Sequence, residues 1–251
     1  MAGTLGVKAA RVAIVVATFA TWEILSRAGI VNPRLLPSAS DTLATLWELL
    51  QRASVRNDLA VTASEVLAAF ILAVPCGALI GFAIAENRYL AEVVKPLLFF
   101  AFSIPKSIFL PMFILVFGVG FSQKVGFGFF STIFIVIMST TTAVESVKVE
   151  HLTVARSYGA TPLQTAFRVY LPSMLPVLLE ALRISMIFNL TGVILAEMYA
   201  SRDGIGHQIA TWGENFQMKQ LLAGVVMIAA IAMTFNELIR SVETRCSHWR
   251  T

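Results

Sequence analysis

The stretch LAVTASEVLAAFILAVPCGALIGFAIA, from Leu59 to Ala85, decides the fold class. Its only charged side chain is that of Glu65, and it exceeds the ~20 apolar residues that a helix needs to cross a hydrocarbon core. The whole chain is similar in character, with 57% hydrophobic and 14% charged residues and a mean hydropathy of +0.77. Soluble domains have about 45–50% hydrophobic and about 25% charged residues. We therefore expect an all-α integral membrane protein without an extramembrane catalytic domain.

Further apolar segments bring the expected number of transmembrane helices to six. The third segment is too short alone, because a helix gains only ~1.5 Å per residue. It must take residues from Leu97 to Pro105, or be broken by Pro105 and Pro111. We treat residues 1–251 as a single transmembrane domain, with spans at residues 9–27, 58–85, 97–119, 124–145, 174–199 and 220–240.

The basic residues favour an orientation with both termini in the cytoplasm. This orientation puts twelve of the 19 Lys and Arg residues inside and seven outside. The inside set is Lys8, Arg11, Arg88, Lys95, Lys106, Lys148, Arg156, Arg168, Arg183, Arg240, Arg245 and Arg250. The outside set is Arg27, Arg34, Arg52, Arg56, Lys124, Arg202 and Lys219.

Motifs for catalysis, metal binding or nucleotide binding are not found in the sequence. It has no G-x-x-x-x-G-K-[ST] phosphate loop and no G-x-S-x-G elbow. The basic residues form no run, so no nucleic-acid partner is expected. We expect no catalytic residue, cofactor or metal site, since no pair has ligand spacing among Cys76, Cys246, His151, His207 and His248.

A short helix is expected between the first two spans. Ser38 to Asp41 can cap its start, and an apolar stripe follows with helical spacing at Leu43, Leu46, Trp47 and Leu50. Two placements are open. The stripe either lies at the outer membrane interface, where Trp47 suits the headgroup level, or packs on other loops.

The loop at residues 146–172 specifies its own fold. We expect one helix to extend the fourth span as far as Tyr158 and to stop at Gly159, which can adopt a left-handed conformation. Thr161-Pro-Leu-Gln164 is a capping box that starts a second helix, expected to end before Pro172. The buried side of the first helix is predicted from Val144, Val147, Leu152 and Ala155.

This loop resembles that of permease subunits of ATP-binding-cassette (ABC) importers. Their pattern is EAA, three residues, Gly, nine residues, then I-x-L-P. Here Thr153-Val154-Ala155 takes the first place, Gly159 the second and Val169-Tyr170-Leu171-Pro172 the last, with matching spacing. The sequence departs from the pattern at Thr153, where the family usually has Glu.

Within that superfamily, the chain is most similar to the nitrate, sulfonate and taurine import group. The similarity covers roughly Leu35 to Arg240. It is carried by Leu36-Pro-Ser-Ala-Ser-Asp41, Ile104-Pro-Lys-Ser-Ile-Phe-Leu-Pro111, Phe117-Gly-Val-Gly120, Arg156-Ser-Tyr-Gly-Ala160, Ala196-Glu-Met198 and Gly204-Ile-Gly206.

The resemblance implies a transporter of several chains in the bacterial inner membrane. The complete transporter is expected to contain a second permease copy, which forms a homodimer with the first. It is also expected to contain two cytoplasmic ATPase subunits, which bind ATP and Mg, and an extracytoplasmic solute-binding protein. The resemblance also implies that the ATPases contact the loop at Thr153, Ala155, Arg156, Gly159, Ala160, Leu171 and Pro172.

Polar residues within the spans are the candidates for the translocation path, because such groups usually face a bundle interior or an aqueous cavity. The alternative for each is a helix–helix hydrogen bond. The solute is expected to be a small anion such as a sulfonate, taurine or nitrate, while a vitamin-precursor pyrimidine stays open. The candidate path residues are Ser131, Ser185, Asn189, Thr191 and Glu197.

Three other protein classes compete with an importer permease. An ion-coupled secondary transporter usually has inverted repeats, and we find no convincing internal repeat. An intramembrane enzyme needs a paired acid and base within one span. A structural membrane protein would show no solute flux.

Overall fold

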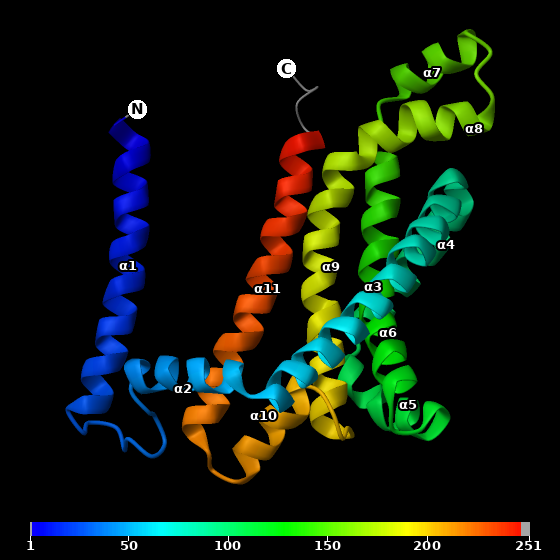
Figure 1. Ribbon diagram of the computed structural model, residues 1–251. Coiled ribbons are helices and arrows are strands. Elements are labelled where there is room, and N and C mark those ends of the chain that lie inside the picture. Colours follow the sequence, from blue (N-terminus) through cyan, green and yellow to red (C-terminus); the bar gives the residue numbers. More distant parts are fainter. Residues whose placement is uncertain (1, 247–251) are drawn as a thin grey trace.

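The structure is a computed structural model that describes the backbone of residues 2–246, so Arg250 and His248 lie outside the described residues. The described residues form helices and connecting turns without a β-strand (Figure 1). The long helices are α1 (Ala2–Arg27), α3 (Ala53–Glu86), α6 (Phe121–Glu145), α9 (Leu171–Tyr199) and α11 (Met218–Cys246). The shorter ones are α2 (Ala39–Gln51), α4 (Arg88–Ser103), the 3₁₀ turn η1 (Lys106–Phe109), α5 (Leu110–Phe117), α7 (Val149–Ser157), α8 (Pro162–Thr165), the π-helical η2 (Ala166–Tyr170) and α10 (Ile205–Glu214).

Six membrane-crossing segments are present when a broken helix is counted as one. Five helices are long and apolar enough to cross a bilayer, and α4 with η1 and α5 forms a sixth segment bent by 81°. The break falls at Ile104 and Pro105, which matches the expected arrangement in which prolines break the third segment. This segment begins at Arg88 rather than at residue 97, because the side chain of Asn87 accepts hydrogen bonds from the first backbone N–H groups of α4.

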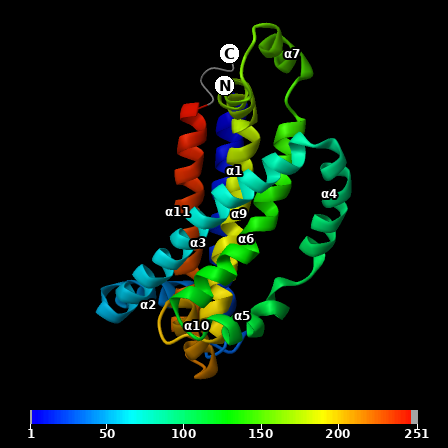
Figure 2. The same cartoon turned by 90° about the vertical axis from the view of Figure 1, so that its right-hand side faces the viewer.

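Helices α3, α6 and α9 form the centre of the bundle (Figure 2). Small residues bring them together: a Cβ at Gly81 of α3 would lie 2.6 Å from the carbonyl oxygen of Ile137 on α6. A side chain at Gly192 of α9 would likewise collide with Ser131 of α6. The G-x-x-x-G motif at Gly77 and Gly81 therefore serves helix packing, as its spacing indicates.

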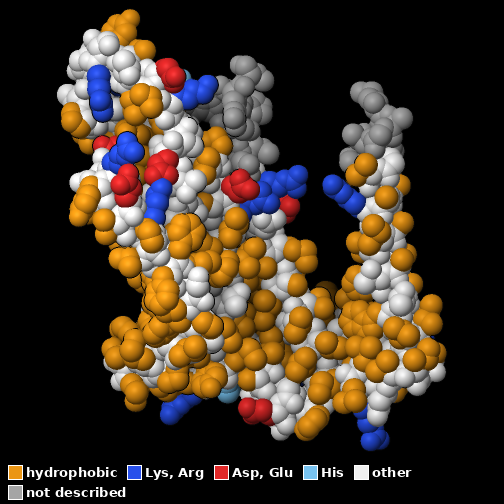
Figure 3. Space-filling view, turned by 180° about the vertical axis from the view of Figure 1, so that it is seen from behind, with side chains coloured by type: hydrophobic (Ala, Val, Ile, Leu, Met, Phe, Trp, Pro, Cys, Tyr) orange, Lys and Arg blue, Asp and Glu red, His pale blue; other side chains and the backbone are white. Residues whose placement is uncertain are grey.

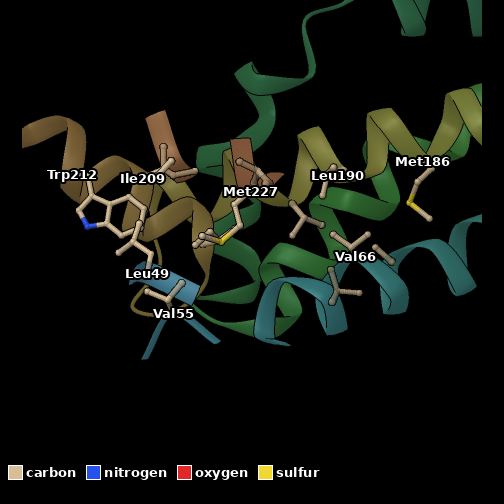
Figure 4. Packing of buried hydrophobic residues seen from close by; sticks show 14 residues of the cluster. Leu49, Val55, Val66, Met186, Leu190, Ile209, Trp212 and Met227 are labelled. Carbon is tan, nitrogen blue, oxygen red and sulfur yellow. The ribbon is translucent and has the colours of Figure 1, made fainter. Parts of the chain in front are cut away.

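The end of the bundle away from α7 is closed by α2, α10 and the start of α11. Leu49 of α2, Trp212 of α10 and Met227 of α11 are buried in one apolar cluster with residues of α3 and α9 (Figure 4). Ser38 caps α2 as expected, its Oγ accepting from the Asp41 N–H at 3.2 Å. Helix α2 packs on α11 through one face and leaves Trp47 exposed, a placement compatible with a membrane interface.

Helix α1 stands apart from the bundle and is attached at its lower end in Figure 1. There the indole N–H of Trp22 donates to the carbonyl of Pro37 at 2.9 Å, and the Ser26 hydroxyl donates to that of Leu36 at 2.7 Å. The start of α1 and the end of α11 both lie at the end of the molecule that carries α7 and α8 (Figure 1). An even number of membrane crossings requires this arrangement.

Charged side chains lie mostly toward the ends of the molecule, and apolar side chains form a band between them (Figure 3). Three of the basic residues counted above lie within the helical bundle rather than in loops. Lys124 is buried against Glu65, Arg183 donates to Asn236 on α11, and Lys106 lies among aromatic rings. These three residues carry no information on loop charge, and without them the bias keeps its sign.

Candidate functional site

Residues 146–170, named here the α7–α8 lobe, project from the bundle between α6 and α9 (Figure 1). Helix α7 ends at a glycine in the left-handed conformation, with Gly159 at φ +70°. The N–H of Gly159 donates to the carbonyl of Arg156, and that of Ala160 to the carbonyl of Ala155, both at 3.0 Å. This pair of bonds is a Schellman motif, which satisfies the last carbonyls of a helix. Gly159 therefore has the conformation that its position predicts.

Helix α8 begins with the predicted capping box. The Thr161 hydroxyl accepts from the Gln164 N–H at 3.3 Å, and the Gln164 side chain accepts from the Thr161 N–H at 2.9 Å. The π-helical segment η2 then connects α8 to α9. The lobe thus has a helix, a glycine turn and a helix.

Two details of the predicted loop are wrong. The first helix does not extend the fourth span, because the chain leaves the helix after Glu145 and resumes it at Val149. The second helix does not end before Pro172, because Tyr170 and Leu171 stay helical and Pro172 occupies the first turn of α9. Helices α8, η2 and α9 follow one another without a break, and the π turn, in which the Leu171 N–H donates to the Ala166 carbonyl, accommodates the proline that has no N–H to donate.

The base of the lobe packs against three membrane helices. Val144, Val147 and Met174 are buried there. The ring of Tyr170 meets that of Phe82 on α3 edge to face at 5.4 Å. The lobe is therefore fixed to α3, α6 and α9, the same helices that form the centre of the bundle.

The tip of the lobe is exposed and partly apolar. Tyr158 is 88% exposed, Leu163 69% and Phe167 64%. Exposed apolar side chains gathered on a projecting element are typical of a protein-binding surface.

The seven residues predicted to contact an ATPase are not gathered at one point. Thr153, Ala155 and Arg156 lie on α7, and the Thr153 hydroxyl donates to the carbonyl of Val149 at 3.0 Å. Gly159 and Ala160 form the turn, whereas Leu171 and Pro172 begin α9 at the base of the lobe.

Four of the five predicted path residues are buried between helices of the same chain. Ser131, Ser185, Asn189 and Glu197 are at most 4% exposed, while Thr191 is exposed and bonds to its own helix. The Asn189 amide donates to the carbonyl of Val66 on α3 at 2.7 Å, the helix–helix bond weighed above as the alternative. Their assignment to the path stays a prediction.

A buried polar cluster joins the lower ends of α3, α6, α9 and α10. Lys124 of α6 forms an ion pair with Glu65 of α3 at 2.5 Å, and both side chains are at most 4% exposed. The Glu197 carboxylate accepts from the Thr62 hydroxyl at 2.6 Å and from the Gly206 N–H at 2.7 Å. The cluster thus fixes the turn after α9 to α3 and α6.

Two glycines make room for this cluster. A Cβ at Gly204, whose φ is +104°, would overlap the Glu197 carboxyl group, and one at Gly206 would lie 2.8 Å from it. A second carboxylate, that of Asp58, accepts from the Gly204 N–H at 3.1 Å and from the side chain of Gln208 at 2.7 Å. The sequence pointed to Glu65 and Glu197 as intramembrane carboxylates but not to their partners.

Comparison with known proteins assigns this architecture to a class. Residues 73–246, more than half of the chain, match the family model of the binding-protein-dependent transport system inner membrane component, and the chain belongs to this family. It is a transport permease of the inner membrane and not an enzyme.

Individual relatives narrow the class to the permeases of ABC importers. The taurine transport system permease protein TauC of Escherichia coli (strain K12) is 26% identical, over 91% of this chain and 85% of the relative. The putative aliphatic sulfonates transport permease protein SsuC of Bacillus subtilis (strain 168) is 24% identical, over 92% and 84%. The formylaminopyrimidine transport permease protein ThiX of Halalkalibacterium halodurans is 25% identical, over 91% of each chain.

Solved structures show the same fold. A chain of the methionine ABC transporter MetNI, in an inward-facing conformation, superimposes with a TM-score of 0.59 at 21% identity. The match covers 79% of this chain and 98% of that one. This chain is therefore an ABC importer permease with a six-segment helical fold.

Proposed function

We propose that this permease is driven by cytoplasmic ATPase subunits that bind the α7–α8 lobe. The single observation that carries the proposal is the build of the lobe, a projecting element with an exposed apolar tip and a base packed on α3, α6 and α9. Movement of the tip would be transmitted to these three helices, because close packing transmits displacement. ATP and Mg are bound by the partner ATPases, and this chain supplies neither a nucleotide site nor a cofactor.

The orientation follows from the same feature. If the lobe meets cytoplasmic ATPases, the start of α1 and the end of α11, which lie at the same end of the molecule (Figure 1), are also cytoplasmic, as the excess of basic residues favours. The opposite end, with α2 and α10, then faces outward and receives solute from a binding protein. Two copies of the chain, each with one ATPase, form the complete transporter.

The solute is a small organic anion. Relatives named for taurine and aliphatic sulfonates support this choice, and the relative named for formylaminopyrimidine marks the main alternative. The translocation path lies between the two permease copies and includes polar residues of α6 and α9.

The proposal is tested by purifying the tagged chain from native membranes in mild detergent and identifying the co-eluting proteins by mass spectrometry. An ATPase subunit in one-to-one ratio with the permease is expected. If sound preparations repeatedly lack an ATPase, the proposal fails, and an ion-coupled secondary transporter becomes the better explanation.

A further inference from the structure

Lys106 has no role in the lobe or in the buried polar cluster, yet it lies in an unusual place. It follows Pro105 at the break between α4 and α5. Its Nζ is 4.2 Å from the ring centre of Phe102, 5.8 Å from that of Phe188 and 5.9 Å from that of Phe134. Phe134 and Phe188 lie near the middle of α6 and α9, so the ammonium group lies about halfway across the bundle.

An ammonium group at this depth is unfavourable unless it has a partner. The other charged groups inside the bundle have one: Lys124 pairs with Glu65, and Arg183 bonds to Asn236. Among the side chains that the structure describes (residues 6, 7 and 9–241), no carboxylate lies at ion-pair distance from Lys106. The Lys106 ammonium group donates to the carbonyl of Phe102 at 3.5 Å, and aromatic rings compensate a buried cation only in part.

The backbone around Lys106 indicates that this part of the chain lines a water-filled cavity rather than facing lipid. Helix α4 ends at Ser103, and the second half of the segment starts at Lys106 after a bend of 81°. Broken helices at membrane depth occur where they are buried in protein or line an aqueous cavity. Here Ser107 is exposed and Lys106 half-buried, so the break lies on the surface of the single chain.

We propose that Lys106 binds the anionic group of the transported solute at the middle of the membrane path. The ammonium group matches an oxyanion such as a sulfonate in charge and in hydrogen-bond donors. The faces of Phe102, Phe134 and Phe188 suit the short aliphatic part of such a solute. This inference rests on the proposed function, since the face must line the path of the assembled transporter.

A charge-selective labelling experiment tests the site without knowledge of the natural solute. Ser107→Cys is introduced in a background of Cys76→Ala and Cys246→Ser, and the permease with its bound ATPases is kept in membranes open on both sides. The thiol is labelled with 2-sulfonatoethyl methanethiosulfonate, itself a small sulfonate, or with the cationic trimethylammonium reagent of similar size. The labelling rate with the anionic reagent is divided by the rate with the cationic reagent. This ratio is then divided by the corresponding ratio for free glutathione.

The anionic reagent is expected to react preferentially, and Lys106→Met is expected to lower the ratio about tenfold, as for one charge a few ångströms away in a partly aqueous site. Lys106→Arg should preserve the ratio, and Lys219→Met, at the outer end, should leave it unchanged. A cysteine at Ile71 of α3, an apolar position that is 65% exposed and is expected to lie against lipid, should react with neither reagent.

Two outcomes overturn the inference: a thiol at position 107 that neither reagent reaches, or a ratio that Lys106→Met leaves unchanged. The co-purifying ATPase is quantified from the same membranes. An unchanged ratio with the ATPase present refutes the anion site alone, whereas a missing ATPase refutes the proposed function and leaves the labelling result valid for the chain itself.

Discussion

Gly159 shows how a single residue can decide a local fold. With φ at +70° and no atom within 4 Å of an added Cβ, the position excludes other residues by backbone conformation and not by space. Its conformation is predictable because the signals are local: a helix pattern before it and a capping box after it.

Replacing Gly159 by Val should weaken ATPase binding without unfolding the bundle. A β-branched side chain strongly disfavours positive φ, so the turn between α7 and α8 would be rebuilt. We expect at least a tenfold fall in co-purified ATPase, because ~1.4 kcal/mol of lost binding corresponds to a factor of ten. The measurement is ATPase recovered per permease.

The matched control is Gly29→Val. Gly29 has φ +69° and also has free space around it, but it lies at the other end of the molecule. The assignment of the lobe would be contradicted if both variants retained the ATPase equally, or if both lost it equally.

The Glu65–Lys124 ion pair is a residue-scale feature that could not be predicted. Both residues are visible in the sequence, but they lie on different helices, and Lys124 comes only four residues after the loop glycine Gly120, where a solvent-exposed lysine would be ordinary. Pairing between distant segments depends on helix packing, which one sequence does not specify.

Removing one partner of this pair should destabilise the protein strongly. Glu65→Gln leaves a buried ammonium group without a counter-charge, and such changes cost about 3–5 kcal/mol. The double variant with Lys124→Met should recover most of this loss. Thermal unfolding in detergent measures both effects.

Glu92→Gln serves as the control, because the Arg88–Glu92 pair is exposed and should contribute at most about 1 kcal/mol. A single variant at Glu65 as stable as the wild type would argue against a buried charge pair.

Among the described elements, α3 and α6 pack against each other most extensively. Gly81 approaches the Ile137 carbonyl on α6, and Gly77 faces Val136, with an added Cβ 2.8 Å from the Val136 Cβ. Small residues four apart allow a close helix contact, but their spacing does not specify which helix makes it.

Gly81→Val should force these helices apart. An added side chain must displace backbone of α6 and the nearby Thr140, so we expect a loss of about 2 kcal/mol or more and a lower yield of folded permease. Gly6→Val in α1, where nothing lies within 4 Å, should behave as wild type. Equal stability of the two variants, measured by thermal unfolding, would contradict the packing of α3 on α6.

The broken segment marks the limit of prediction at this scale. The two prolines and the short apolar run predicted a break or an extension, and the structure shows a break with an earlier start at Arg88. Its bend depends on packing against α6 and α9, so the position of Lys106 among the three rings is not readable from spacing.

At the scale of the whole molecule, the composition and the loop pattern were sufficient to predict the class of protein. The number of membrane segments, the projecting lobe and the family were all predictable, because apolar length and helix caps are local properties. The path residues were less predictable: helical periodicity identifies a polar face but not whether it meets another helix of the chain or the solute. Asn189, bonded to α3, illustrates this difficulty.

Contact between the α7–α8 lobe and the ATPase can be measured by site-specific photo-crosslinking in native membranes. A benzoylphenylalanine residue replaces Tyr158 at the lobe tip, or Phe216 in the turn after α10, which is 76% exposed at the opposite end. An ATPase crosslink is expected from position 158 and none from position 216. An ATPase crosslink from position 216, or none from position 158 while the ATPase still co-purifies, would contradict it.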